Sequence, residues 1–77
     1  MSVNIEEAKK LIIQIIHRKS SGVSIPEIDR IFVKKMPEII FGDEYKLATL
    51  IKELEGENII TWTGKGYTKG PNFPDDF

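Results

Sequence analysis

The sequence predicts a small α+β domain with three helices, one short strand and a C-terminal two-stranded β-hairpin. Three stretches have the apolar spacing of amphipathic helices, at about 5–19, 24–35 and 44–56. Residues 59–63 are β-branched and aromatic, which favours a strand. A chain of 77 residues can bury only one small core. We therefore expect one domain over residues 1–70 and a flexible tail over 71–77, where no periodicity is present.

A cap and an apolar stripe predict the first helix. Asn4, followed three residues later by Glu7, is typical of a capped helix start. Apolar residues then recur every three or four positions, at Ile5, Ala8, Leu11, Ile12, Ile15 and Ile16. The basic residues 17–19 complement the negative end of the helix dipole, and Gly22 follows where the helix stops.

The second helix is predicted by a capping box after the short extended piece Val23-Ser24. Ser24 is the N-cap, Glu27 stands at the third helical position, and Pro26 lies in the first turn. The helix should end near Lys35, because Pro37 disfavours helical geometry at the residue before it. We expect the following segment, 36–42, to be an apolar loop that packs back onto the core.

The third helix and the hairpin follow from similar signals. Asp43 is expected to cap a helix over 44–56 whose buried side is Leu47, Leu50, Ile51 and Leu54. Asn58 tolerates the left-handed conformation that a helix ending requires. A strand over 59–63, a tight turn at Gly64-Lys65-Gly66 and a returning strand over 67–69 complete the hairpin.

Composition excludes several classes of function. The chain has no Cys and one His, which rules out disulfides, thiolate chemistry and multi-His metal sites. Its longest apolar runs are far shorter than the roughly 18–20 residues of a membrane span, and its first residues lack a signal-peptide pattern. No nucleophile, base and oxyanion donor come together. We expect a cytoplasmic protein without a cofactor or enzymatic activity.

Charge is divided unevenly along the chain. The net charge is −1, but residues 1–35 hold seven basic and four acidic side chains, and residues 36–77 hold four and eight. A phosphate-binding surface requires local positive charge and not a basic total. The division therefore permits a nucleic-acid interface without establishing one.

The order of the elements resembles the winged-helix family over about residues 3–70. Residues 21–28 look like the short strand and capped second helix of that family. Residues 50–60 look like its third helix running into its second strand, and residues 60–68 look like its hairpin wing. The chain departs from the family pattern at Asn58, where Gly is usual, and in the longer apolar segment 36–42.

This resemblance implies binding to double-stranded DNA, with the third helix in the major groove and the wing on the backbone or in the minor groove. Lys46, Thr49 and Lys52 are the candidate groove contacts on the third helix. Lys65 and Tyr67 are the candidates on the wing, and Lys34 and Lys35 could reach backbone phosphate. Other interpretations are equally good: Lys65 could serve solubility alone, and Lys34 and Lys35 could complement the dipole at the end of the second helix.

A protein–protein module, or a homodimer, is the alternative. It is favoured by the acidic third helix and by apolar residues outside the helical stripes. These residues are Met36, Ile39, Ile40, Phe41, Trp62, Phe73 and Phe77. Two interpretations without a partner remain open: residues 36–41 could fill the core, and Trp62 could have a structural role. The sequence leaves both classes of function standing.

Overall fold

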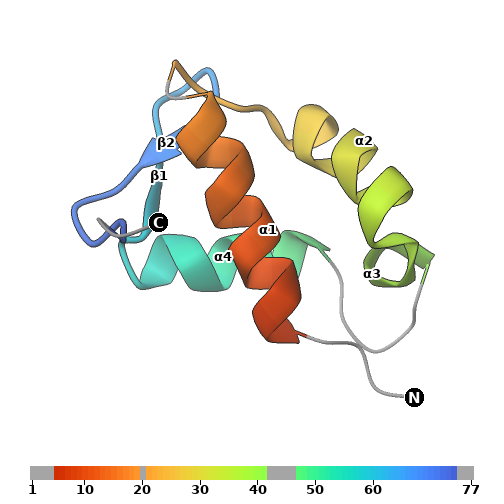
Figure 1. Ribbon diagram of the computed structural model, residues 1–77. Coiled ribbons are helices and arrows are strands. Elements are labelled where there is room, and N and C mark those ends of the chain that lie inside the picture. Colours follow the sequence, from red (N-terminus) through yellow and green to blue (C-terminus); the bar gives the residue numbers. More distant parts are fainter. Residues whose placement is uncertain (1–4, 20, 42–46, 75–77) are drawn as a thin grey trace.

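The computed structural model describes residues 5–19, 21–41 and 47–74, with only the backbone of Phe41 (Figure 1). Along these residues the elements follow in the order α1 (Ile5–Arg18), α2 (Ile25–Lys35), α3 (Pro37–Phe41), α4 (Leu47–Gly56), β1 (Ile60–Trp62) and β2 (Tyr67–Lys69). β1 and β2 form a two-stranded antiparallel sheet. The predicted α+β class is confirmed. The proposed caps Asn4 and Asp43 lie outside the described residues.

The helices surround one core. α1 crosses α4 and contacts β2, while α2 packs mainly against α3 (Figure 1). The largest fully buried side chains come from all four helices and from β1, and they include Phe32, Ile12, Ile28, Ile39, Leu50 and Ile60. No polar or charged side chain among the described residues is buried. The fold is therefore held by apolar packing and by its backbone hydrogen bonds.

α2 has the predicted boundaries, although its cap differs from the prediction. Ser24 is the N-cap, in an extended conformation, and the helix runs over Ile25–Lys35. The Ser24 hydroxyl makes no hydrogen bond to the helix backbone; it donates to the Glu27 carboxylate at 3.3 Å. Glu27 also accepts from Lys19 Nζ at 2.6 Å. This carboxylate therefore joins the start of α2 to the end of α1.

Residues 37–41 are a short helix and not the predicted apolar loop. The Met36 N–H donates to the Phe32 carbonyl at 2.8 Å, which ends α2. Pro37 then begins α3, because a proline ring suits the first helical position as well as it disfavours the residue before it. Ile39 points inward and is fully buried, so this segment does pack onto the core as expected.

The end of α4 sets the start of the hairpin. Asn58 has φ 61°, the left-handed conformation that the sequence predicted. The N–H of Ile59 donates to the Leu54 carbonyl and that of Asn58 to the Glu55 carbonyl, both at 3.0 Å. These two bonds form a Schellman ending. The chain reverses there and enters β1 beside the helix it has just left.

A third strand segment joins the hairpin. Val23 forms an isolated antiparallel bridge with Tyr67. The Tyr67 N–H donates to the Val23 carbonyl at 2.7 Å, and the Val23 N–H donates to the Tyr67 carbonyl at 2.9 Å. The short extended piece predicted at residues 23–24 thus pairs with β2, which lies between it and β1.

Residues 71–74, the described part of the predicted tail over 71–77, lie against the domain. Phe73 packs on the core, and its ring stacks with that of His17 at a centroid distance of 6.3 Å. Lys69 Nζ lies 5.0 Å from the centre of the Phe73 ring. The Asn72 side chain donates to the Glu57 carbonyl at 3.0 Å. These contacts fasten the segment after β2 to α1 and to the end of α4.

Gly66→Ala should destabilise the domain by about 2 kcal/mol, because overpacking against fixed backbone typically costs this much. A Cβ at Gly66 would lie 2.9 Å from the backbone nitrogen of Val23, so the strand segment would have to move. Gly56→Ala is the matched control, since nothing lies within 4 Å of its Cβ. We expect Gly56→Ala to stabilise the domain by about 0.5 kcal/mol, because Ala has the higher helix propensity. Urea unfolding of both variants tests the bridge between Val23 and Tyr67. Equal changes in the free energy of unfolding would contradict it.

Candidate nucleic-acid interface

α4 presents two faces with different chemistry. Leu47, Leu50, Ile51 and Leu54 are buried, as the sequence predicted. Helical spacing places Thr49 and Lys52 on the opposite side, and both are exposed. Lys46, the third predicted contact on this helix, lies outside the described residues. The outward face of α4 therefore carries one hydroxyl and one ammonium group.

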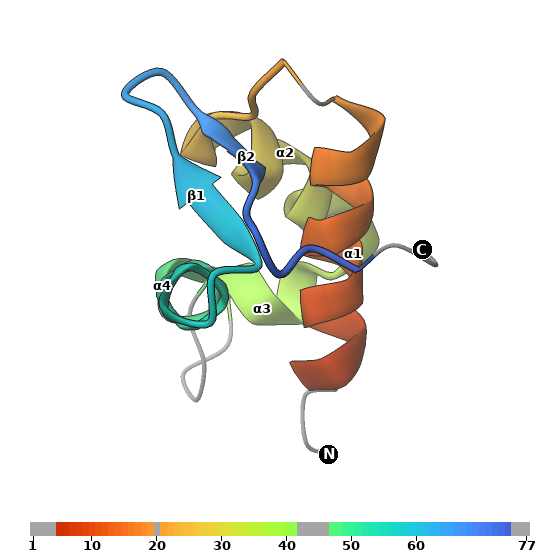
Figure 2. The same ribbon diagram turned by 90° about the vertical axis from the view of Figure 1, so that its left-hand side faces the viewer.

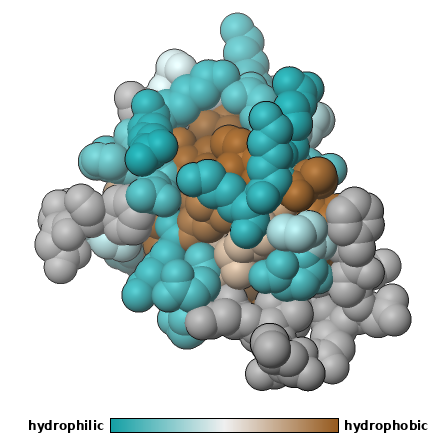
Figure 3. All heavy atoms as spheres, turned by 45° about the vertical axis from the view of Figure 1, so that its right-hand side comes forward, coloured by the Kyte–Doolittle hydropathy of each residue, from teal (hydrophilic) through white to brown (hydrophobic). Residues whose placement is uncertain are grey.

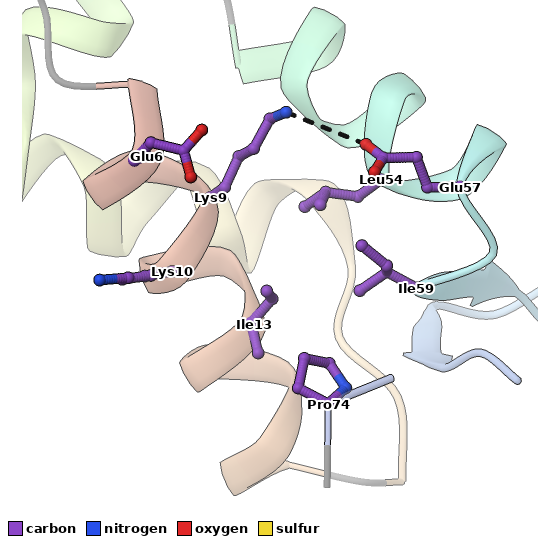
Figure 4. Close-up of a pocket in the computed structure, with 8 residues that line it drawn as sticks. All are labelled: Glu6, Lys9, Lys10, Ile13, Leu54, Glu57, Ile59 and Pro74. Atoms are coloured by element: carbon purple, nitrogen blue, oxygen red, sulfur yellow. Dashed lines mark ion pairs between the residues drawn. The ribbon is translucent and has the colours of Figure 1, made fainter. Parts of the chain in front are cut away.

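Two carboxylates of this region turn toward α1. Lys9 Nζ lies 3.8 Å from Glu53 Oε2 and 3.9 Å from Glu57 Oε1. Figure 4 shows Lys9 reaching from α1 to the carboxylate of Glu57 across a cavity of about 400 Å³. The apolar lining of this cavity includes Ile13, Leu54, Ile59 and Pro74. One cation of α1 thus offsets part of the negative charge that the sequence assigned to the third helix.

A third carboxylate is directed to the hairpin. Tyr67 is only 8 % exposed, and its hydroxyl lies near the carboxylate of Glu55. Burial raises the pKa of the Tyr67 hydroxyl, and the negative charge of Glu55 raises it further. Tyr67 was predicted as an exposed contact on the wing. The structure places it in the core, where it joins β2 to α4.

The hairpin turn, residues 63–66, is built by Thr63. Its hydroxyl donates to the Gly66 carbonyl at 2.8 Å and accepts from the Gly66 N–H at 3.3 Å. The Thr63 N–H also donates to the Gly66 carbonyl, at 2.9 Å. Gly64 has φ 95°, which a residue with a side chain rarely adopts. Lys65 is exposed in this ordered turn, as predicted.

Trp62 is half exposed beside the turn. It is directly opposite Tyr67 in the sheet, so both side chains lie on the same face of the hairpin. The two ring centres are 5.0 Å apart, and 47 % of Trp62 remains exposed. Since Tyr67 faces Glu55 of α4, the exposed part of Trp62 lies on the face of the hairpin that is turned to α4.

Only some of the predicted DNA contacts come together. Figure 2 shows α4 and the hairpin turn on the same side of the molecule, away from α1. Thr49, Lys52 and Lys65 belong to these two elements. Lys35 instead lines a groove with residues of α1, and Lys34 lines a shallow pocket with Arg30 at the outer surface of α2. The two lysines that end α2 are therefore separate from the surface that α4 and the hairpin share.

The residues predicted to contact a protein partner lie in different environments, some buried and some exposed. Ile39 is fully buried, so it is a core residue and not a surface contact. Met36, Ile40 and Phe73 are partly buried against the core. Trp62 is the member of this set with a large exposed apolar surface among the described residues. The side chain of Phe41 and the whole of Phe77 lie outside the described residues.

Comparison with protein-family models, curated proteins and solved structures finds no match for this chain. In the described ranges, no group of three or more His, Asp or Glu residues is placed to hold a metal ion. None of the helices there has the length and apolarity to cross a membrane. The inference about function therefore depends on the geometry of the surface formed by α4 and the hairpin.

Tyr67→Phe should lower the free energy of unfolding by about 1–2 kcal/mol at neutral pH, because it removes the interaction of a buried hydroxyl with the charged Glu55. The raised pKa of Tyr67 means that the folded protein holds this proton more tightly than the unfolded chain does. The Tyr67 hydroxyl therefore contributes to the free energy of unfolding below pH 10, the ordinary pKa of tyrosine. This contribution is lost as the pH rises through the higher pKa that Tyr67 has in the folded protein.

Urea unfolding of both proteins at a series of pH values from neutral to above 10 measures this effect. The difference in stability between the wild type and Tyr67→Phe should shrink above pH 10. A difference that stays constant through this range would show that the hydroxyl does not interact with Glu55.

Proposed function

We propose that this chain is a winged-helix protein that binds double-stranded DNA through α4 and the hairpin turn. The observation that carries the proposal is the direction of the carboxylates on α4 and directly after it. Glu53 and Glu57 face Lys9, and Glu55 faces the Tyr67 hydroxyl. Thr49 and Lys52 remain on the outward surface of the helix. The surface that would enter the major groove is therefore not acidic, although the helix is acidic in composition.

Each exposed group has a role in this proposal. Lys52 binds a phosphate or a guanine edge in the major groove, and Thr49 bonds to a base or touches a thymine methyl. Lys65, at the tip of the ordered turn, contacts the phosphate backbone next to that groove. Trp62 supplies an apolar surface between the helix and the turn, against the sugar edge.

The small number of cations sets the expected strength of binding. Lys52 and Lys65 neutralise few phosphates, so non-specific affinity is modest and log K falls with log salt concentration by a shallow slope of about two for each copy. Two copies on adjacent half-sites would double the number of phosphate contacts, as dimeric helix-turn-helix proteins do. We therefore propose that the chain works as a DNA-binding regulator at paired sites and has no enzymatic role.

Neutralising the two exposed lysines tests the proposal. Lys52→Gln with Lys65→Gln should weaken binding to duplex DNA at least about tenfold at low salt, because two phosphate contacts are lost. The slope of log K against log salt concentration should become less steep by about two. Fluorescence anisotropy with a labelled random duplex over a range of salt concentrations measures both quantities.

The matched control is Arg18→Gln with Lys35→Gln, which changes the net charge equally but lies on α1 and α2. This control should bind DNA within about twofold of the wild type and with the same salt dependence. Equal losses in the two double variants would show that binding reports total charge and no defined face. Absence of any binding by the wild type at low salt would overturn the proposed function.

A further inference from the structure

α1 and α2 diverge and leave an apolar groove between them. Figure 3 shows hydrophobic surface at the bottom of a hollow that is surrounded by hydrophilic side chains. The floor of this hollow consists of Leu11 and Ile15 of α1, Val23, and Ile31 of α2. Its volume is about 330 Å³. Leu11 and Ile31 are only partly buried, so the floor is open to solvent. We call this feature the α1–α2 groove.

The groove continues toward the end of α2. A second hollow of about 380 Å³ shares Leu11, Gln14 and Lys35 with the first and reaches Lys10 and Met36. From Lys10 to Arg18 the α1 wall is about 12 Å long, since each helical residue rises 1.5 Å. The α1–α2 groove is therefore long enough for about two turns of a helix.

The rim of the groove is positively charged. Four cationic side chains line the two hollows: Lys10, Arg18, Lys19 and Lys35. Two carboxylates line them as well, Glu7 at one end and Glu27 at the other. The Lys19 ammonium group lies 2.6 Å from Glu27 and holds the pKa of that carboxyl below its ordinary value. Lys19 and Glu27 therefore offset each other's charge, and the remaining charged groups, Lys10, Arg18 and Lys35 against Glu7, leave the walls next to the apolar floor net positive.

We propose that the α1–α2 groove binds an acidic amphipathic helix of a protein partner. A trough between two helices accepts a third helix that packs on both at 8–10 Å. Apolar side chains of the partner cover Leu11, Ile15 and Ile31. Carboxylates on both flanks of the partner helix reach Lys10 and Arg18 on one wall and Lys35 on the other.

The charges select this occupant over others. A basic helix would place like charges against Arg18 and Lys35, which is repulsive. A second copy of α1 is a poorer match than an acidic helix, because its exposed face carries Lys10 and Arg18 as well as Glu6 and Glu7. Duplex DNA would contact the cations but leave the apolar floor uncovered. An acidic helix with one apolar face satisfies both parts of the surface.

Three labelled peptides of about four helical turns test the proposal with the full chain. The first has leucines along one face and glutamates along the other. The second carries lysines in place of the glutamates, and the third has the composition of the first in an order that gives no apolar face. Fluorescence anisotropy should show saturable binding of the first peptide only. Equal binding of the first and second peptides, or no binding of the first, would overturn the proposal.

Two double variants locate the site. Arg18→Gln with Lys35→Gln should weaken binding of the acidic amphipathic peptide about tenfold, since it removes a cation from each wall. Lys52→Gln with Lys65→Gln should leave peptide binding within about twofold of the wild type, because neither residue lines the groove. All four side chains are exposed, so both variants should fold, and their thermal midpoints check this. If Arg18→Gln with Lys35→Gln leaves peptide binding unchanged, the peptide contacts another surface and the proposal is contradicted. The outcome does not depend on DNA binding, which the two variants are expected to affect in the opposite order.

Discussion

Tyr67 holds the hairpin in place, and the proposed DNA surface depends on that placement. Its backbone exchanges two hydrogen bonds with Val23, which ties β2 to the segment between α1 and α2. Its ring contacts Trp62, and its hydroxyl reaches Glu55 of α4. One buried residue therefore fixes the position of the hairpin relative to two other segments, the one around Val23 and α4. Without these contacts, a two-stranded sheet of this size is marginally stable and could not keep Lys65 on the same side as α4.

The distribution of charge follows from the same packing. A net charge of −1 gives no reason to expect binding to a polyanion. The structure separates the charges, because Lys9 faces two carboxylates near α1 and Tyr67 accounts for a third. Other cations line two surfaces, one on α4 and the hairpin turn, the other along the α1–α2 groove, while Arg30 and Lys34 lie on the outer surface of α2. The total charge of so small a domain is thus a poor guide to what either surface binds.

Local signals in the sequence predicted most of the elements. The cap at Ser24, the apolar stripes and Asn58 located α2, the inward face of α4 and the start of the hairpin, because each is set by neighbouring residues. Pro37 was interpreted as a helix breaker only, so the short helix after it was missed. Three features join residues distant in the chain and have no periodic signal. These are the contacts of Lys9, the interaction between Tyr67 and Glu55, and the groove, whose depth depends on the angle between α1 and α2.

The most direct test of the account is an NMR titration of the labelled protein with a short DNA duplex at low salt. If α4 and the hairpin turn form one surface, backbone amide shifts should change together at Thr49, Lys52 and residues 64–66. The amides of Gln14 and Ile31, which line the α1–α2 groove, should stay unchanged. Changes concentrated in the groove, or on the hairpin turn without α4, would contradict the account.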